Sequence, residues 1–165
     1  MSYLNDLIEV VGVAECFPEL CSDCDFWTQI SVPENLTIPE QKPDVEQLVK
    51  VSARVEIFSK RIVKTPVSCG PNLAGNCLTG RKLIIEGHLK QKVFYVADLP
   101  EQPVHAAHFQ VPFSAFIIIP SDIDSCTKFR IIPYIEDVFV KMINKRDFFK
   151  NVALFLQAKR TDCCC

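Results

Sequence analysis

Nine cysteines give this sequence most of its capacity for chemistry. Thiols form disulfides and bind soft metal ions, and an odd number leaves at least one thiol without a partner in its own chain when all are oxidised. The count therefore indicates either a bond between chains or a free thiol. The cysteines fall into four groups along the sequence: Cys16 with Cys21 and Cys24, Cys69 with Cys77, Cys126 alone, and Cys163 with Cys164 and Cys165.

Three successive cysteines close the sequence. A disulfide between adjacent residues is strained, and a tail with no sequence after it has little to pack against, so these thiols favour partners on other chains. The N-terminal group is expected to act in the same way, which predicts reactive thiols at both ends of a compact subunit. Cys69 and Cys77 flank a glycine-rich stretch and are expected to form a disulfide within the chain. No role is assigned to Cys126.

Metal binding is the main competing use of these thiols. Cys21 and Cys24 have the C-x-x-C spacing of a zinc site, and Cys69 and Cys77 could in principle supply two further ligands. Structural zinc sites usually combine two tight pairs, and Cys69 and Cys77 are too widely spaced to be one. The trio at 163–165 could also chelate zinc or copper(I). Disulfide chemistry is the preferred interpretation, and we assign no metal and no cofactor.

Catalysis has few candidate residues, because the histidines of the sequence are His88, His105 and His108. Nucleophilic catalysis needs a serine or cysteine beside a histidine, and no nucleophile-elbow, phosphate-loop or dinucleotide-binding motif accompanies these three. His105 and His108 are three residues apart, so on a strand they point to opposite faces and could not share a metal ion. The chain is therefore expected not to be an enzyme.

The elements that position these residues are strands. Apolar and polar residues alternate with a period of two, which is typical of half-buried strands, over 49–63, 82–97, 104–119, 130–143 and 148–159. Long strands joined by turns predict an all-β fold, an antiparallel β-sandwich of jelly-roll-like type. Alternation places Val49, Val51 and Ala53 on one face of the first strand. Pro112 predicts an edge position or a bulge in the third.

A proline-rich stretch over 33–43 is predicted to be extended and to separate an N-terminal segment from the strands. We therefore divide the chain into a cysteine-containing arm (1–37), a β-domain (38–160) and a cysteine tail (161–165). Leu4, Leu7, Ile8 and Val11 of the arm have helical spacing, but the β-branched residues there also suit a strand. The two alternatives are a short helix packed on its own domain and a strand that pairs with the sheet edge of another subunit.

Composition sets limits on partners and location. Hydrophobic residues make up 48% and charged residues 23%, near the globular average, and the net charge is −2. Because basic and acidic residues are interspersed, no basic face for nucleic acid is expected. No signal peptide is evident, and no run approaches the roughly 18 apolar residues that span a bilayer. A product made in the cytosol is expected, where thiols usually stay reduced, and this conflicts with the cysteine count.

Four ordered blocks of the sequence resemble the SPOCS domain family, which occurs in proteins of bacterial endospore coat assembly. The similar blocks lie at 38–66 (IPEQKPDVEQLVKVSARVEIFSKRIVKTP), 80–98 (GRKLIIEGHLKQKVFYVAD), 104–117 (VHAAHFQVPFSAFI) and 138–159 (VFVKMINKRDFFKNVALFLQAK). His105, His108 and the Val-Pro-Phe run at 111–113 match the family's motif. The family assigns these residues no catalytic role.

The resemblance implies a spore-forming Firmicute and removes the conflict over the cysteines. Coat proteins are made in the reducing mother cell and meet oxidising surroundings when that cell lyses, so disulfides form after assembly. We therefore expect a structural, self-assembling subunit of the spore surface, in the coat, the exosporium or an appendage fibre. Its expected partners are other copies of itself and other spore-coat proteins, with neither nucleic acid nor a membrane. The alternatives are an adaptor that docks a coat-morphogenesis protein and a zinc- or copper-binding protein.

Overall fold

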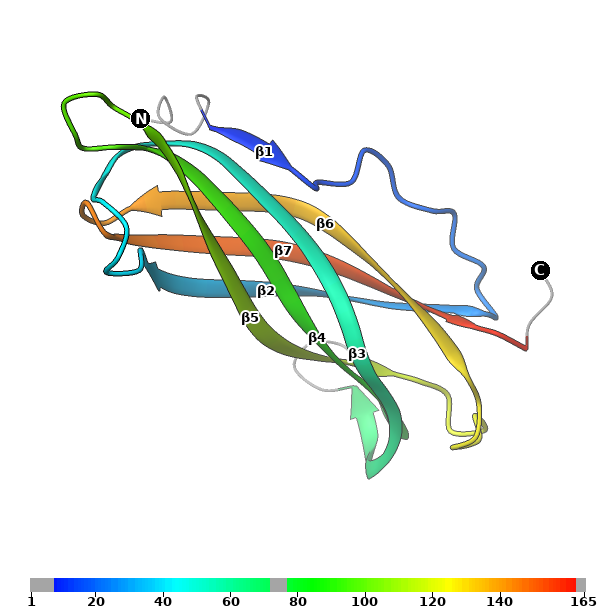
Figure 1. The fold of residues 1–165 in the computed structure, drawn as a ribbon. Helices are drawn as coiled ribbons and strands as arrows, with labels where there is room; N and C mark the ends of the chain where they lie inside the picture. The colour runs from blue at the N-terminus through cyan, green and yellow to red at the C-terminus, as the bar shows by residue number, and fades with distance from the viewer. Residues whose placement is uncertain (1–7, 72–76, 163–165) are drawn as a thin grey trace.

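The protein is a two-sheet β-sandwich (Figure 1). The computed structural model describes residues 8–71 and 77–162, with the backbone alone of Cys69, and the residues described form strands and no helix. One sheet has the order β1-β3-β4-β5 and the other β2-β7-β6. The fold class predicted from the sequence is confirmed. The strands are β1 (Glu9–Val11), β2 (Asp25–Thr37), β3 (Val45–Pro71), β4 (Cys77–Ala97), β5 (Val104–Ile118), β6 (Phe129–Met142) and β7 (Asp147–Arg160).

The core lies between the two sheets, and the alternation of the sequence builds it. Successive side chains of a strand point to opposite faces, so every second residue of β4 faces the other sheet. Each of these core-facing residues of β4 is almost fully buried, and fully burying one such aliphatic side chain contributes about 1.5–3 kcal/mol. The buried apolar residues of β4 are Leu83, Ile85, Leu89, Val93, Tyr95 and Ala97, and those of β7 that face them are Phe148, Val152, Leu154, Leu156 and Ala158.

Strand β2 differs from the sequence prediction. Residues 25–37 were expected to lie in an arm, but they pair with β7 along their whole length, from Asp25 opposite Lys159 to Thr37 opposite Asp147. The proline-rich stretch 33–43 was expected to be extended and to separate this arm from the strands. Pro33 is tolerated because β2 is an edge strand, where one N–H can be missing without breaking the ladder. Residues 25–37 therefore belong to the sandwich.

Strand β3 changes its alternation at a bulge. The register with β4 shifts between Leu48 and Lys50, so Leu48 and Val51 are both buried while Val49 is 38% exposed. An inserted residue moves the following side chains to the other face of the strand. The expectation that Val49 shares a buried face with Val51 was therefore wrong. The expectation that Ala53 shares a face with Val51 was correct, because both side chains are buried.

Three of the four edge strands carry a proline. Pro112 lies on β5 at the edge of its sheet, opposite His88 in a continuous register, so the predicted edge position is confirmed and there is no bulge. Pro33 lies on β2, one edge of the other sheet, and Pro133 lies on β6, its opposite edge. A proline removes a donor from an exposed edge and so weakens edge-to-edge pairing with another chain.

The segment after residue 8 joins the two sheets along one side. Strand β1 pairs in parallel with β3, and two residues later Val13 forms a parallel bridge to Ile135 of β6. Gly12 makes this crossing possible, because its φ is +109° and a Cβ there would overlap the carbonyl oxygen of Ala53. Of the two alternatives for the arm, the described part is a strand, and it pairs within its own chain. Leu4 and Leu7 lie outside the described residues.

Within the residues that the structure describes, no helix has the length and apolar character needed to cross a membrane.

Candidate functional site: the cysteine-bearing end

The antiparallel arrangement of β2, β7 and β6 brings cysteines from distant parts of the sequence to one end of the sandwich. Strands β2 and β6 begin at the end where β7 finishes. The backbone N–H of Arg160 donates to the carbonyl oxygen of Cys24 at 2.9 Å, and the N–H of Thr161 donates to that of Lys128 at 3.0 Å. The end of β7 therefore lies between Cys24 and the loop that carries Cys126.

The hairpin of β3 and β4 reaches the same end (Figure 1). The N–H of Ile119, at the start of the loop before β6, donates to the carbonyl oxygen of Arg81 at 3.3 Å, and the Thr79 hydroxyl donates to the carbonyl oxygen of Ile119 at 2.5 Å. Cys77 is two residues from Thr79 and pairs in register with Pro71. The disulfide expected between Cys69 and Cys77 stays a prediction.

This placement corrects the expectation that reactive thiols occupy both ends of the subunit. Cys21, Cys24, Cys77 and Cys126 lie at the end where β7 finishes, and the turns 38–44, 98–103 and 143–146 lie at the other. The cause is that β2 and β7 are antiparallel neighbours, so the chain enters the sheet and leaves it at the same end. Cys163, Cys164 and Cys165 lie outside the described residues, and the last described residue, Asp162, lies at this end.

Local structure decides how accessible each described thiol is. The side chain of Asp25, itself buried, accepts from the N–H of Cys21 at 2.8 Å and from the amide of Gln157 at 3.1 Å, which fixes the turn that leads into β2. Cys24 is buried beside this turn, whereas Cys16, Cys77 and Cys126 are exposed. The Asp124 carboxylate accepts from the N–H of Cys126 at 3.2 Å, and this backbone hydrogen bond holds the pKa of Asp124 below its ordinary value.

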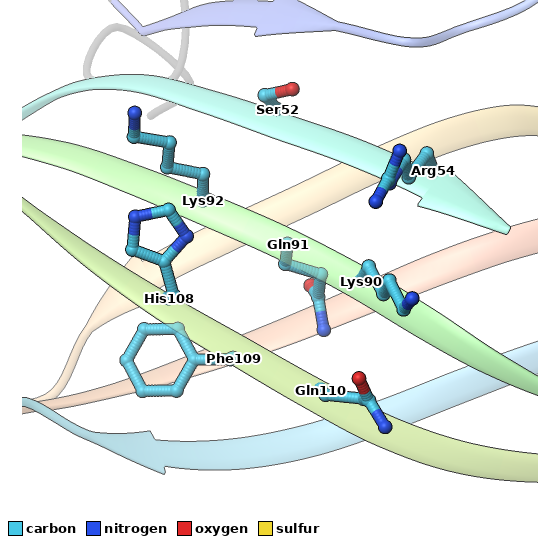
Figure 2. A pocket seen from close by; sticks show the side chains of 8 residues that line it. All are labelled: Ser52, Arg54, Lys90, Gln91, Lys92, His108, Phe109 and Gln110. Atoms are coloured by element: carbon cyan, nitrogen blue, oxygen red, sulfur yellow. The ribbon is translucent and has the colours of Figure 1, made fainter.

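The histidines do not form a site with the cysteines that the structure describes. His105 stacks against the buried Tyr95 with ring centroids 5.9 Å apart, while His108 is exposed beside Lys92 on the outer face of its sheet (Figure 2). The two histidines lie on opposite faces of β5, as the spacing predicted. Among the described residues, no group of three or more histidine, cysteine or acidic side chains could hold a metal ion.

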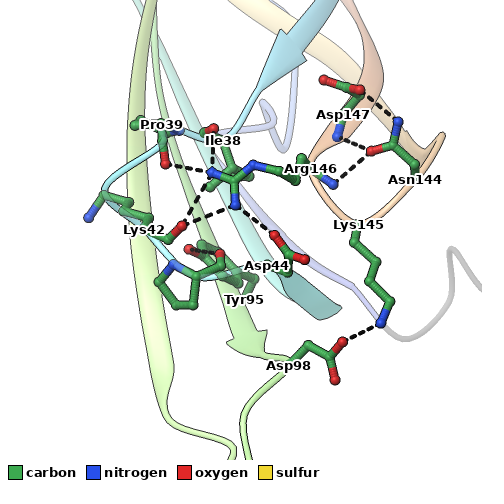
Figure 3. A network of polar contacts seen from close by, with 11 residues as sticks. Ile38, Pro39, Lys42, Asp44, Tyr95, Asp98, Asn144, Lys145, Arg146 and Asp147 are labelled. Atoms are coloured by element: carbon green, nitrogen blue, oxygen red, sulfur yellow. Dashed lines mark hydrogen bonds and ion pairs between the residues drawn. The ribbon is translucent and has the colours of Figure 1, made fainter.

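The opposite end is held by one arginine (Figure 3). The Arg146 guanidinium donates to the Asp44 carboxylate at 2.6 Å and to the carbonyl oxygen of Pro39 at 2.8 Å, with further bonds to the carbonyls of Ile38 and Lys42. These contacts tie the connection from β2 to β3, which passes from one sheet to the other, to the β6–β7 turn. This end is a structural clamp with no exposed thiol among its described residues.

The comparison with protein families decides what kind of β-sandwich this is. The family model SipL, SPOCS domain, matches residues 44–143. The chain belongs to this family. Membership associates it with assembly of the bacterial spore coat. Searches among curated proteins and among solved structures gave no match.

The SPOCS match covers β3, β4, β5 and β6, and therefore the outer face that carries His108. It leaves out β2 and β7, so the second sheet is only partly covered. The N-terminal and C-terminal cysteine groups also lie outside the matched residues, while Cys69, Cys77 and Cys126 lie inside them. The resemblance to the SPOCS domain family inferred from the sequence is confirmed.

Proposed function

We propose that this protein is a structural subunit of the endospore surface that associates with copies of itself and is then locked by disulfides between chains. It is made in the mother cell and deposited on the spore, where oxidation follows lysis of that cell. Its role is structural rather than catalytic. Other spore-coat proteins are further partners, and the assembled form is a coat layer or an appendage fibre.

The observation that carries this proposal is the convergence of cysteines at one end of a foldable domain. Segments around residues 21–24 and 126 meet at the end of β7, immediately before the three terminal cysteines. The exposed thiols of Cys16 and Cys126 are accessible to a second chain. Membership of a coat-assembly family supports a place where such thiols meet an oxidant.

The test is imaging of the purified full chain with and without reductant. Regular assemblies that survive hot detergent under oxidising conditions and loosen with reductant are the expected result. The variant Cys163→Ser/Cys164→Ser/Cys165→Ser should lose most detergent-resistant oligomers. The matched control, Cys69→Ser/Cys77→Ser, removes the pair expected to bond within the chain and should keep them.

Two results would count against the proposal. Monomer alone under oxidising conditions would exclude disulfide-locked assembly. Full coat deposition by the triple-serine variant would instead favour an adaptor that docks a coat protein without cross-linking.

A further inference from the structure

The outer face of the sheet β1-β3-β4-β5 carries a shallow hollow of about 420 Å³ (Figure 2). The strand register arranges its polar side chains in two rows across the sheet, so that they form one continuous surface. We call this surface the cationic hollow, and its outward-facing residues are Ser52, Lys92 and His108 in one row and Arg54, Lys90 and Gln110 in the next.

The hollow has more positive than negative charge. Lys90 pairs with Glu56 in the neighbouring row, and this hydrogen bond lowers the pKa of Glu56, so the two charges offset each other. Arg54 and Lys92 make no ion pair with any described residue. Lys92 lies over the Phe94 ring at 4.6 Å from its centroid. Two cations of the hollow are therefore available to an external anionic group.

The opposite face of the sandwich carries an acidic segment, which we define as residues 15–23. Phe17 anchors it on the sheet β2-β7-β6, with ring centroids 5.3 Å from Phe155 and 5.8 Å from Tyr134. The segment has no basic residue, and its three carboxylates are all exposed. Two of its apolar side chains are also exposed, Phe17 at 50% and Leu20 at 40%. The exposed acidic residues are Glu15, Glu19 and Asp23.

Association through the edges formed by β2, β5 and β6 is disfavoured. Pro33, Pro112 and Pro133 each remove a donor from an edge strand, and β6 is also bridged by Val13. An additional strand from another copy would meet an interrupted ladder at each of these edges. The faces of the sandwich carry complementary charges through which self-association can occur.

We propose that the cationic hollow of one copy receives the acidic segment of a second copy. The proposal rests on the self-association proposed above and names the surfaces that make it. Because the hollow and the segment lie on opposite faces, each copy keeps one free hollow and one free segment, so the contact repeats without closing and builds a stack. In a stack of similarly oriented copies, the cysteine-bearing ends lie next to each other along one flank, where disulfides can join neighbours.

Charge reversal on each surface gives a test that does not depend on cysteines. The full chain is kept reduced at low ionic strength, and assembly is followed by light scattering and electron microscopy. Arg54→Glu/Lys92→Glu makes both surfaces acidic, and Glu19→Lys/Asp23→Lys makes both basic. Each variant alone should need about tenfold more protein to assemble, because like charges then face each other.

An equimolar mixture of the two variants should assemble like the wild type, because the acidic hollow of one then meets the basic segment of the other. Wild-type stacks should also dissociate as salt rises to about 1 M, where exposed charges are screened within about 3 Å. The matched control is Lys64→Glu/Lys141→Glu, which changes the net charge as much as the hollow variant does but lies outside both surfaces. It should assemble normally.

Failure of this contact and failure of the proposed structural role give different results. Unchanged assembly of both reversed variants, or a mixture of folded variants that does not recover, overturns this contact while leaving the proposed structural role intact. Absence of any wild-type assembly under oxidising conditions overturns the structural role itself. If Arg54→Glu/Lys92→Glu assembles normally but no longer retains a duplex DNA probe that the wild type binds, the hollow serves an anionic polymer instead of a second copy.

Discussion

Lys150 is a fully buried cation between the two sheets. Its ammonium lies 3.8 Å from the Glu34 carboxylate, which also accepts two hydrogen bonds from the Gln91 amide, at 2.9 and 3.1 Å. Burial lowers the pKa of Lys150 to about 8, an effect partly offset by Glu34, and burial raises the pKa of Glu34. Loss of solvation is thus the larger effect on both groups, so burying the two charges costs more free energy than their mutual attraction returns.

Removing one member of this pair should be far more harmful than removing both. Glu34→Gln leaves Lys150 buried without its counter-charge and should lower the free energy of unfolding by about 3–5 kcal/mol. Glu34→Leu/Lys150→Met fills the site with apolar atoms and should lie within about 1 kcal/mol of the wild type or above it. Urea unfolding at pH 7 measures both, and equal losses in the two variants would contradict the argument.

The Glu34→Gln variant should also recover stability as the pH rises. The pKa of Lys150 in the folded protein lies below that in the unfolded chain, about 10.4. Between these values the unfolded chain binds more protons, so the free energy of unfolding increases with pH. The increase should begin below pH 8 in the variant, because Glu34 no longer favours the ammonium. Urea unfolding from pH 7 to 9 measures this increase. A free energy of unfolding that falls with pH, relative to that of Glu34→Leu/Lys150→Met, would contradict the predicted direction.

Arg146 makes contacts that a lysine cannot reproduce. Its planar guanidinium reaches Asp44 and carbonyls of the β2–β3 connection at once, whereas an ammonium is a single point donor. Arg146→Lys should lower the free energy of unfolding by about 2–3 kcal/mol, since several carbonyls lose a charged donor. The neighbouring substitution Lys145→Ala removes only an exposed ion pair with Asp98 and should leave the urea midpoint almost unchanged. Similar midpoints for the two variants would show that the clamp is dispensable.

Among the strands, the long ones could be predicted from alternation and the exceptions could not. The predicted stretch 82–97 coincides with most of β4, since both faces of that strand follow a strict period of two. The sequence prediction did not include β2, because the proline-rich stretch 33–43 was expected to separate an arm from the strands, although Phe26, Ile30 and Val32 alternate towards the core. The bulge at Leu48 leaves no mark in composition. The convergence of the cysteines at one end could not be predicted without the strand order, because β2 pairs with β7 across more than a hundred residues of sequence.

Gly12 controls the crossing from β1 to β6. Gly12→Ala should strain the backbone by about 1–3 kcal/mol and push the segment away from Ala53, because its φ of +109° disfavours any side chain. The amide of Ala14, which donates to Ile135 at 2.9 Å, should then exchange with solvent faster, while the amides of β7 stay protected. Hydrogen exchange by mass spectrometry measures this. Gly70→Ala, where a Cβ would meet nothing within 4 Å, is the control.

For the assembled subunit, the placement of the cysteines predicts which end takes part in cross-linking. Ser125→Cys adds a thiol in the exposed loop beside Cys126, at the end where β7 finishes, and Glu101→Cys adds one in the β4–β5 turn at the opposite end. In oxidised assemblies the thiol introduced by Ser125→Cys should enter disulfides with other chains. The thiol introduced by Glu101→Cys should form no disulfide with a native cysteine of another chain, because neighbouring copies in a stack present like ends to one another and the turns at this end contain no cysteine.

Mass spectrometry of alkylated and non-reduced peptides distinguishes the two positions. The expected pattern is linkage among peptides that contain residues 16–24, 125–126 and 163–165, with the Glu101→Cys peptide linked to none of them. Disulfides that join the Glu101→Cys peptide to the native cysteine peptides would mean that copies meet end to end through opposite ends, which the face-to-face stack forbids. Cross-linking confined to one end would let a subunit with many cysteines form an ordered assembly, since the proposed stack fixes which thiols can meet before any of them is oxidised.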